Sequence, residues 1–178
     1  LGDAARAHPA LKIACLRYFN PVGAHISGLI GEDPVGTPNN LVPYIAQVAL
    51  GSLPKLKVFG SDYTTPDGTG LRDYIHVDDL ASGHLLALQY LEGHSGVLTV
   101  NLGTGKPYSV LEMIATFEKV SGKPIPYDLV ERRSGDLAEY YANSDLAKAT
   151  LGWQAKHGIE RMCEDAWRFY SRLYAQKL

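Results

Sequence analysis

Short apolar runs of strand length alternate with amphipathic helical segments along this chain of 178 residues. The first run, residues 12–19, is almost continuously apolar and stops at a turn over residues 20–23. Such a run is typical of a parallel strand that is covered on both faces. Further strands are expected at residues 56–59, 74–77, 97–102 and 127–130. Strands followed by crossover helices predict an α/β fold.

The helical segments carry recognisable start signals. Asn40 and Asp78 stand at N-cap positions, and Ser109 with Glu112 predicts a capping box. Residues 24–40 lack regular spacing and predict a long, functional loop. The helix after Asp78 is expected to bury the face formed by Leu80, Ala81, Leu85, Leu88 and Leu91. The last helix is expected to pack through the stripe of Ile159, Met162, Cys163, Ala166, Trp167, Tyr170 and Leu173.

Composition excludes several classes of function. A formal net charge of −2 and a pI near 6.3 give no general attraction for nucleic acid or an anionic membrane. No apolar run approaches the ~20 residues of a membrane helix, and no signal segment opens the sequence. A cytoplasmic, reducing location is therefore expected, with Cys15 and Cys163 as core residues rather than a disulfide or metal pair.

Arg72 and Arg133 are the first candidates for ligand binding. A diphosphate is best held by delocalised cations with fork geometry, and both arginines lie in loops next to glycine, at Gly70 and Gly135. The alternative for each is an ordinary surface arginine. Asp136 is either an ion-pair partner for these arginines or an acceptor for ribose hydroxyls.

Other candidates have an equally plain structural alternative. Phe59 ends a strand, where an aromatic ring serves the core or a ligand platform. Asn20 is a turn former or a ligand contact at the carboxyl end of a parallel strand. We expect His76 to be structural rather than a general base, and residues 103–105 to form a turn rather than a phosphate loop. The remaining histidines show no metal-ligand spacing.

Four segments, taken in order, resemble the substrate-binding half of the UDP-glucose 4-epimerase family, within the extended short-chain dehydrogenase/reductases. They are residues 16–23 (LRYFNPVG), 38–41 (PNNL), 70–77 (GLRDYIHV) and 132–136 (RRSGD). The resemblance implies the C-terminal portion of a Rossmann-like α/β fold with a small mixed α/β substrate-binding domain. Residues 11–23 and 73–105 would be Rossmann strands and helix, and residues 24–72 and 106–178 would be mainly the substrate-binding domain.

The resemblance also implies roles for individual residues. The two arginines would bind the phosphates of a UDP-sugar, Phe59 would cover the uracil ring, and Asp136 would accept from the ribose. The implied substrate-binding set is Asn20, Asn40, Leu41, Lys57, Phe59, Arg72, Arg133, Asp136 and Tyr140. Tyr18, Phe19 and Pro21 are implied contacts of NAD. A bulky residue at position 140 restricts N-acetylated hexoses in this family, which implies a preference for UDP-glucose and UDP-galactose.

The implied activity is reversible 4-epimerisation with bound NAD. The Gly-rich phosphate loop and the Tyr-x-x-x-Lys pair of the family are absent from this sequence, so no catalytic residue is assigned. We expect a C-terminal fragment that is inactive and binds NAD weakly alone, needs an N-terminal dinucleotide-binding part, and comes from a homodimeric enzyme. Because the strand at residues 12–19 would lack neighbouring strands, we expect the fragment to self-associate through that edge or to be only partly ordered there. Rival interpretations are another NAD-dependent nucleotide-sugar dehydratase or decarboxylase, or a non-catalytic UDP-binding module.

Overall fold

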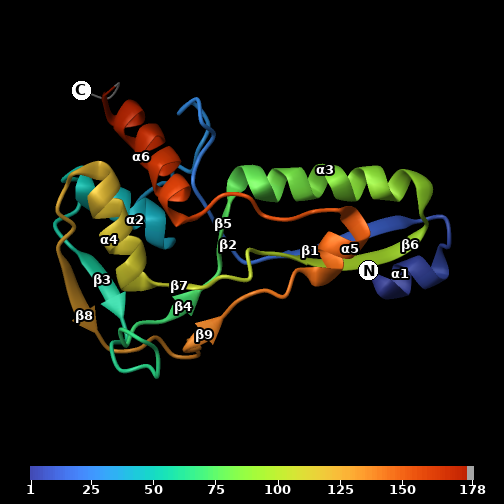
Figure 1. The fold of residues 1–178 in the computed structure, drawn as a ribbon, viewed down its shortest axis with the longest axis horizontal. Coiled ribbons are helices and arrows are strands. Elements are labelled where there is room, and N and C mark those ends of the chain that lie inside the picture. The colour runs from blue at the N-terminus through green and yellow to red at the C-terminus, as the bar shows by residue number, and fades with distance from the viewer. Residues whose placement is uncertain (176–178) are drawn as a thin grey trace.

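The alternation of strands and helices is present in the structure, a computed structural model that describes residues 1–175. The helices are α1 (Gly2–Ala7), α2 (Leu41–Ala49), α3 (Val77–Gly93), α4 (Val110–Ser121), α5 (Asp145–Leu151) and α6 (Ile159–Ala175) (Figure 1). The strands are β1 (Lys12–Tyr18), β2 (Asn20–Val22), β3 (Leu56–Phe59), β4 (Leu71–Arg72), β5 (Tyr74–His76), β6 (Gly96–Leu102), β7 (Tyr108–Ser109), β8 (Tyr127–Val130) and β9 (Glu139–Tyr140). The expected α/β class is confirmed. None of the helices within residues 1–175 has both the length and the apolar composition needed to cross a membrane.

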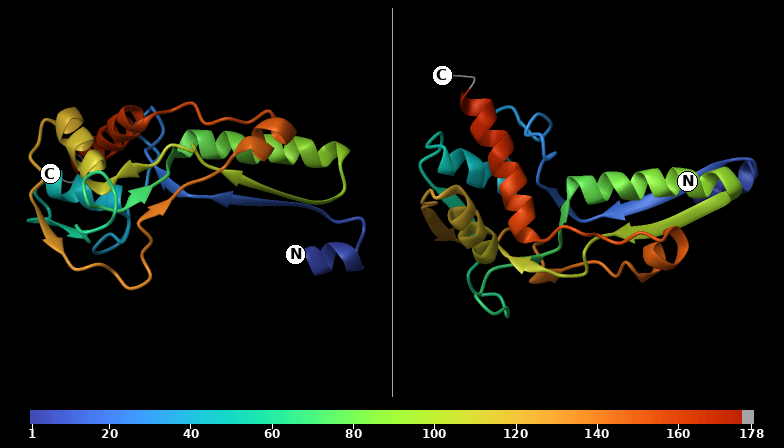
Figure 2. Two further views of the ribbon diagram at one scale, coloured as in Figure 1. Left: turned by 60° about the horizontal axis from the view of Figure 1, so that its bottom comes forward. Right: turned by 45° about the horizontal axis from the view of Figure 1, so that its top comes forward.

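One half of the molecule is a parallel pair of long strands with a helix along it. β1 pairs with β6 from Lys12↔Gly96 to Tyr18↔Leu102, and α3 lies beside both strands (Figure 2). The expectation that β1 is covered on both faces is wrong, because no residue of this strand is fully buried. Within residues 1–175, β6 is its only partner strand.

Helix α3 differs from expectation at its start and on its buried face. His76, not Asp78, is the N-cap, and its Nδ1 accepts from the Asp78 amide at 3.0 Å. Leu85 and Leu88 of the expected apolar face are exposed, and the buried side carries Gly83 and Ala87. The reason is close packing, since a Cβ at position 83 would lie 2.7 Å from the Leu102 side chain. The small residues therefore decide which face meets the sheet.

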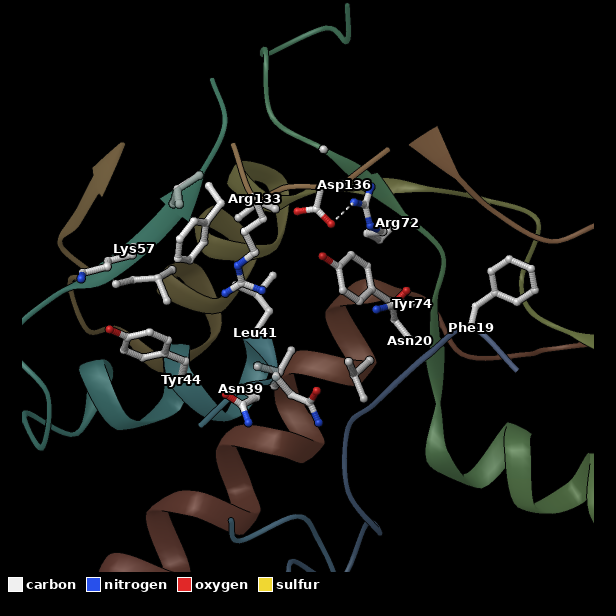
Figure 3. A pocket seen from close by; sticks show the side chains of 18 of the residues that line it. Phe19, Asn20, Asn39, Leu41, Tyr44, Lys57, Arg72, Tyr74, Arg133 and Asp136 are labelled. Atoms are coloured by element: carbon white, nitrogen blue, oxygen red, sulfur yellow. Dashed lines mark hydrogen bonds and ion pairs between the residues drawn. The ribbon is translucent and has the colours of Figure 1, made fainter. Parts of the chain in front are cut away.

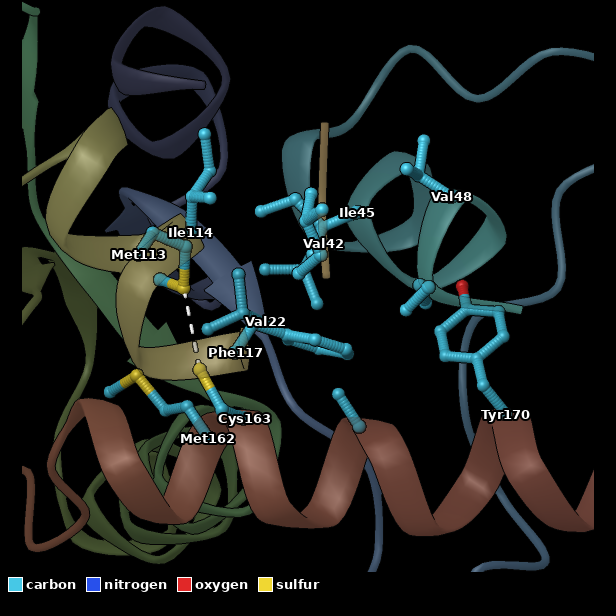
Figure 4. Packing of buried hydrophobic residues seen from close by; sticks show 14 of the residues in the cluster. Val22, Val42, Ile45, Val48, Met113, Ile114, Phe117, Met162, Cys163 and Tyr170 are labelled. Atoms are coloured by element: carbon cyan, nitrogen blue, oxygen red, sulfur yellow. Dashed lines mark hydrogen bonds between the residues drawn. The ribbon is translucent and has the colours of Figure 1, made fainter. Parts of the chain in front are cut away.

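The other half has its own core, formed by α2, α4 and α6 together with β3, which pairs with the more exposed β8 (Figure 4). The predicted Ser109–Glu112 capping box starts α4, and the predicted apolar stripe of α6 is largely buried there. Cys163 lies in this core with its sulfur 3.6 Å from that of Met113. Cys163 is therefore the core residue that was expected, whereas that expectation is wrong for Cys15, which is only partly buried on β1; both are free thiols.

Asp73 connects the two halves. Its carboxylate is fully buried and accepts from the Thr104 amide (2.9 Å), the Thr104 hydroxyl (2.6 Å), the Gly105 amide (2.9 Å) and the Ala142 amide (3.1 Å). The expected turn at residues 103–105 is confirmed, and it is held by this side chain. Asp73 also follows β4, which pairs with both β7 and β9. The backbone of Arg72 in β4 is therefore held by β7 on one side, by β9 on the other, and by the buried Asp73 that follows it.

We predict that Asp73→Ala lowers the free energy of unfolding by about 2–5 kcal/mol, because it leaves several buried donors without an acceptor. Urea denaturation followed by circular dichroism measures this loss. The matched control is Asp128→Ala, which removes an exposed ion pair with Lys55 at 3.0 Å and is expected to cost at most about 1 kcal/mol. Equal losses in the two variants would contradict the role given to Asp73.

Candidate functional site

A cavity of about 390 Å³ lies at the boundary between the two halves, a volume suited to a small organic ligand (Figure 3). Its walls come from β2, β3, β4, the start of α2 and the segment after β8. Most of the residues singled out from the sequence line it. They are Phe19, Asn20, Pro21, Asn40, Leu41, Lys57, Phe59, Arg72, Arg133 and Asp136.

Parallel pairing brings Phe59 and Arg133 together. β3 pairs with β8 in parallel, with Phe59 opposite Val130, so the segment that follows β8 emerges beside the Phe59 ring. The guanidinium carbon of Arg133 lies 3.9 Å from the centre of that ring. Gly135, at φ +83°, allows the tight turn in which the Asp136 amide donates to the Arg133 carbonyl. A cation and an aromatic face are thus presented to the same end of the cavity.

Arg72 is fixed by three acceptors. Its guanidinium donates to the carbonyls of Leu71 (2.8 Å) and Leu137 (2.9 Å) and to Asp136 Oδ1 (3.3 Å). Gly70 leaves room for it, since a Cβ there would lie 3.1 Å from Arg72 Nη1. Of the two alternatives for Asp136, the ion pair is present in this structure. The pair places a positive and a negative group side by side on the cavity wall.

The start of α2 faces the cavity without a side-chain cap. Asn40 occupies the N-cap position, but its side chain makes no cap bond, so that part of the expectation is wrong. Its Nδ2 donates instead to Glu32 Oε1 at 2.7 Å. Leu41 and Val42, whose amides belong to the first turn, both line the cavity. The cavity therefore receives the positive end of a helix dipole.

Helix α6 holds the loop that presents Asn40. The Tyr170 hydroxyl donates to the Glu32 carbonyl at 2.5 Å, and burial raises the pKa of Tyr170, which keeps it a donor. Gly31 packs on the Phe169 ring, where a Cβ would come within 2.5 Å. The Arg168 guanidinium reaches the Ile26 carbonyl at 3.3 Å. The expected long loop at residues 24–40 is thus fastened to α6.

Three tyrosines of the cavity, Tyr44, Tyr63 and Tyr74, were missed from the sequence. Tyr74 is buried and lies in the centre of the view in Figure 3, and its pairing opposite Asn20 in β2–β5 places it there. Burial raises the pKa of Tyr74 well above its usual range. Tyr44 lies one turn beyond Leu41 on α2, so the helical period was an available signal.

Tyr140 and Tyr18 lie outside the cavity lining. The Tyr140 ring stacks on Phe19 with ring centres 4.7 Å apart, and Phe19 in turn lines the cavity. Tyr18, at the end of β1, is half exposed and its ring lies 5.9 Å from that of His84. Tyr140 therefore contacts a residue of the cavity lining, whereas the Tyr18 ring lies near His84 of α3.

His76 is also outside the cavity, in agreement with its expected structural role. Its Nε2 lies 3.3 Å from Asp165, whose carboxylate also receives Arg161 at 2.6 Å and Arg168. Burial, reinforced by the neighbouring His157, lowers the pKa of His76. No group of three or more His, Cys, Asp or Glu side chains suited to a metal ion is found among residues 1–175.

Comparison with known proteins identifies the family of this chain independently of the geometry of the cavity. The family model of the NAD dependent epimerase/dehydratase family matches residues 1–103. A UDP-glucose 4-epimerase of Pasteurella multocida is 60% identical over 172 residues, which are 97% of this chain and 51% of that protein. The chain thus spans about half the length of the curated relatives it matches.

Two solved structures share the fold. The Stenotrophomonas maltophila UDP-glucose-4-epimerase with NAD and formylated UDP-arabinopyranose is 54% identical, with a TM-score of 0.95 over 98% of this chain and 52% of that chain. The Bifidobacterium longum enzyme, in complex with NAD+ and UDP, is 51% identical, with a TM-score of 0.92 over 96% of this chain and 50% of that chain.

We predict that stability falls as the pH drops from 7.5 to 5.5. The folded pKa of His76 lies below its unfolded value near 6.5, so the unfolded state binds the proton more readily and gains population as the pH falls. In His76→Asn the pH slope of the unfolding free energy should be shallower by up to about 1.4 kcal/mol per pH unit. The exposed control His8→Asn should keep the parent slope; an unchanged slope in His76→Asn would refute this account.

Proposed function

We propose, since the chain belongs to the NAD dependent epimerase/dehydratase family, that it supplies the nucleotide-sugar pocket of a UDP-glucose 4-epimerase. Such an isomerase interconverts UDP-glucose and UDP-galactose and serves galactose metabolism. One observation carries the proposal: a single cavity gathers two arginines, an aromatic ring and the start of a helix, which together suit a nucleoside diphosphate.

Each wall of the cavity has a proposed part in binding. Arg72, Arg133 and the first turn of α2, with Asn40 and Leu41, would hold the diphosphate. Phe59 would cover the uracil ring beside Lys57, and Asp136 would accept from the ribose. Asn20 would contact the sugar, supported by its place beside Tyr74 on the cavity wall. Most of this grip falls on the nucleotide, which leaves the hexose free to turn.

The loose hold on the sugar matters for the reaction. 4-Epimerisation passes through a 4-keto sugar that must present its opposite face before it is reduced, and binding energy from the unreacting UDP keeps it in place meanwhile. NAD, when bound, supplies the hydride acceptor and donor at C4. Phe19 and Pro21 fit that role best among the implied cofactor contacts, because they line the cavity and Tyr18 is not among its lining residues.

Proton transfer would come from outside this sequence. The Tyr-x-x-x-Lys pair is absent from it, so we propose that an N-terminal dinucleotide-binding part supplies these groups, and that the present chain alone is inactive and binds NAD weakly. The exposed β1 edge and the exposed Leu85 and Leu88 of α3 offer that part a surface. We further propose a homodimer for the intact enzyme and, in keeping with two free thiols, a cytoplasmic location.

The domain division follows the same proposal. Residues 11–23 and 73–105 would be the Rossmann portion, and residues 24–72 and 106–178 mainly the substrate-binding domain. The two hydrophobic clusters support this division in part, because Val22 and Tyr74 of the proposed Rossmann portion pack in the cluster of the other half. Residues 145–155, through α5 and Trp153, pack against the Rossmann portion.

We predict that the chain binds UDP in calorimetric titration and that Arg72→Ala weakens binding about tenfold or more. The reason is the loss of charge-assisted hydrogen bonds to phosphate, each worth about 1.5–3 kcal/mol. Arg6→Ala is the control, because Arg6 is exposed on α1, is paired with Asp3 and does not line the cavity. A folded chain without UDP affinity, or equal behaviour of the two variants, would sink the proposal.

We predict that Tyr140→Cys, in the enzyme that contains this chain, raises turnover of UDP-N-acetylglucosamine while UDP-glucose turnover is retained. The smaller side chain would open space beside Phe19, on which the Tyr140 ring now stacks. Coupled assays of both substrates measure the effect. No gain with the N-acetylated substrate would contradict the proposed selectivity.

A further inference from the structure

The Arg133 guanidinium lies over the Phe59 ring, the ring that would cover the base in the proposed function. Its guanidinium carbon is 3.9 Å from the centre of the Phe59 ring, and both residues line the cavity (Figure 3). A planar group at that distance covers the ring face as a stacked base would. A base and the Arg133 guanidinium therefore compete for one surface.

Arg133 differs from its neighbours in having no anionic partner within residues 1–175. Arg72 is bonded to Asp136 and two carbonyls. Arg132, adjacent in sequence, is bonded to Asp62 at 2.7 Å and lies over the Tyr63 ring instead. Arg133 is exposed, and the ring of Phe59 is the contact that holds its guanidinium.

We infer that the Arg133–Phe59 pair is a specificity device that admits a nucleoside only together with its diphosphate. This inference rests on the proposed function of the cavity. An incoming diphosphate draws the guanidinium from the ring into charge-assisted hydrogen bonds, which are stronger than the contact given up. The freed face then receives the base. A nucleoside without phosphate displaces the same cation and provides no anion in return.

The inference makes a prediction of opposite sign for two ligands. In Arg133→Ala the ring face is already free, so uridine should bind about two- to fivefold more tightly, the factor that an exposed cation–π contact is worth. UDP should bind about tenfold or more weakly, because it loses its phosphate partner. A residue that acts only as a phosphate anchor would weaken UDP and leave uridine unchanged.

Arg132→Ala is the matched control, because it removes the same charge one residue away and Arg132 is not among the residues that line the cavity. Uridine affinity, measured by NMR titration, should stay at the parent value in this control, and UDP affinity should change far less than in Arg133→Ala. Circular dichroism of each variant confirms that it is folded.

The outcomes separate the inference from the proposed function. Tighter uridine binding in Arg133→Ala with weaker UDP binding supports the device. Uridine affinity that is unchanged or lower in Arg133→Ala, while the parent chain binds UDP, overturns the device and leaves the nucleotide pocket standing. If the folded parent chain binds neither UDP nor uridine, the pocket and the device are overturned together.

Discussion

A single buried carboxylate holds the geometry of the cavity. Asp73 has no access to solvent and receives hydrogen bonds from residues 31, 32 and 69 positions further along the chain. A charge in such a place is tolerated only when its lone pairs are filled, so the turn at 103–105 and the segment that follows β9 must come to it. Because Arg72 precedes Asp73 directly, the same constraint sets where the guanidinium stands. The proposed hold on an anion thus depends on a residue that does not itself line the cavity.

The two arginines of the cavity are held in different ways. Arg72 is anchored by two carbonyls and Asp136, so it offers a charge whose position is settled before any ligand arrives. Arg133 rests on an aromatic face and can move at small cost. A fixed cation provides preorganisation, and a movable one provides discrimination between ligands. The cavity combines both, with Arg72 on β4 and Arg133 in the segment that follows β8.

Much of this could be predicted from the sequence, and the errors share a physical cause. Strand positions followed from apolar runs, and the α4 start from its capping box, because these signals are local. The prediction of the buried face of α3 was wrong because it counted apolar side chains. Gly83 has no side chain, and its close packing becomes evident only from the position of its partner Leu102. Likewise the Asn40 side chain bonds Glu32 instead of capping α2, which depends on a loop contact. Tyr74 is recognised as a cavity residue only from its strand register opposite Asn20.

The fastening of the loop at residues 24–40 to α6 has a consequence for the order of folding. Tyr170 and Arg172 reach back to Glu32 and Ser27 across 138 and 145 positions of sequence. Contacts of such separation form late, because the loop closure they require is entropically unfavourable until other structure is in place. During synthesis, the rim that presents Asn40 must wait until α6 has left the ribosome. The rim of the candidate site therefore takes its final form only after α6 has been synthesised.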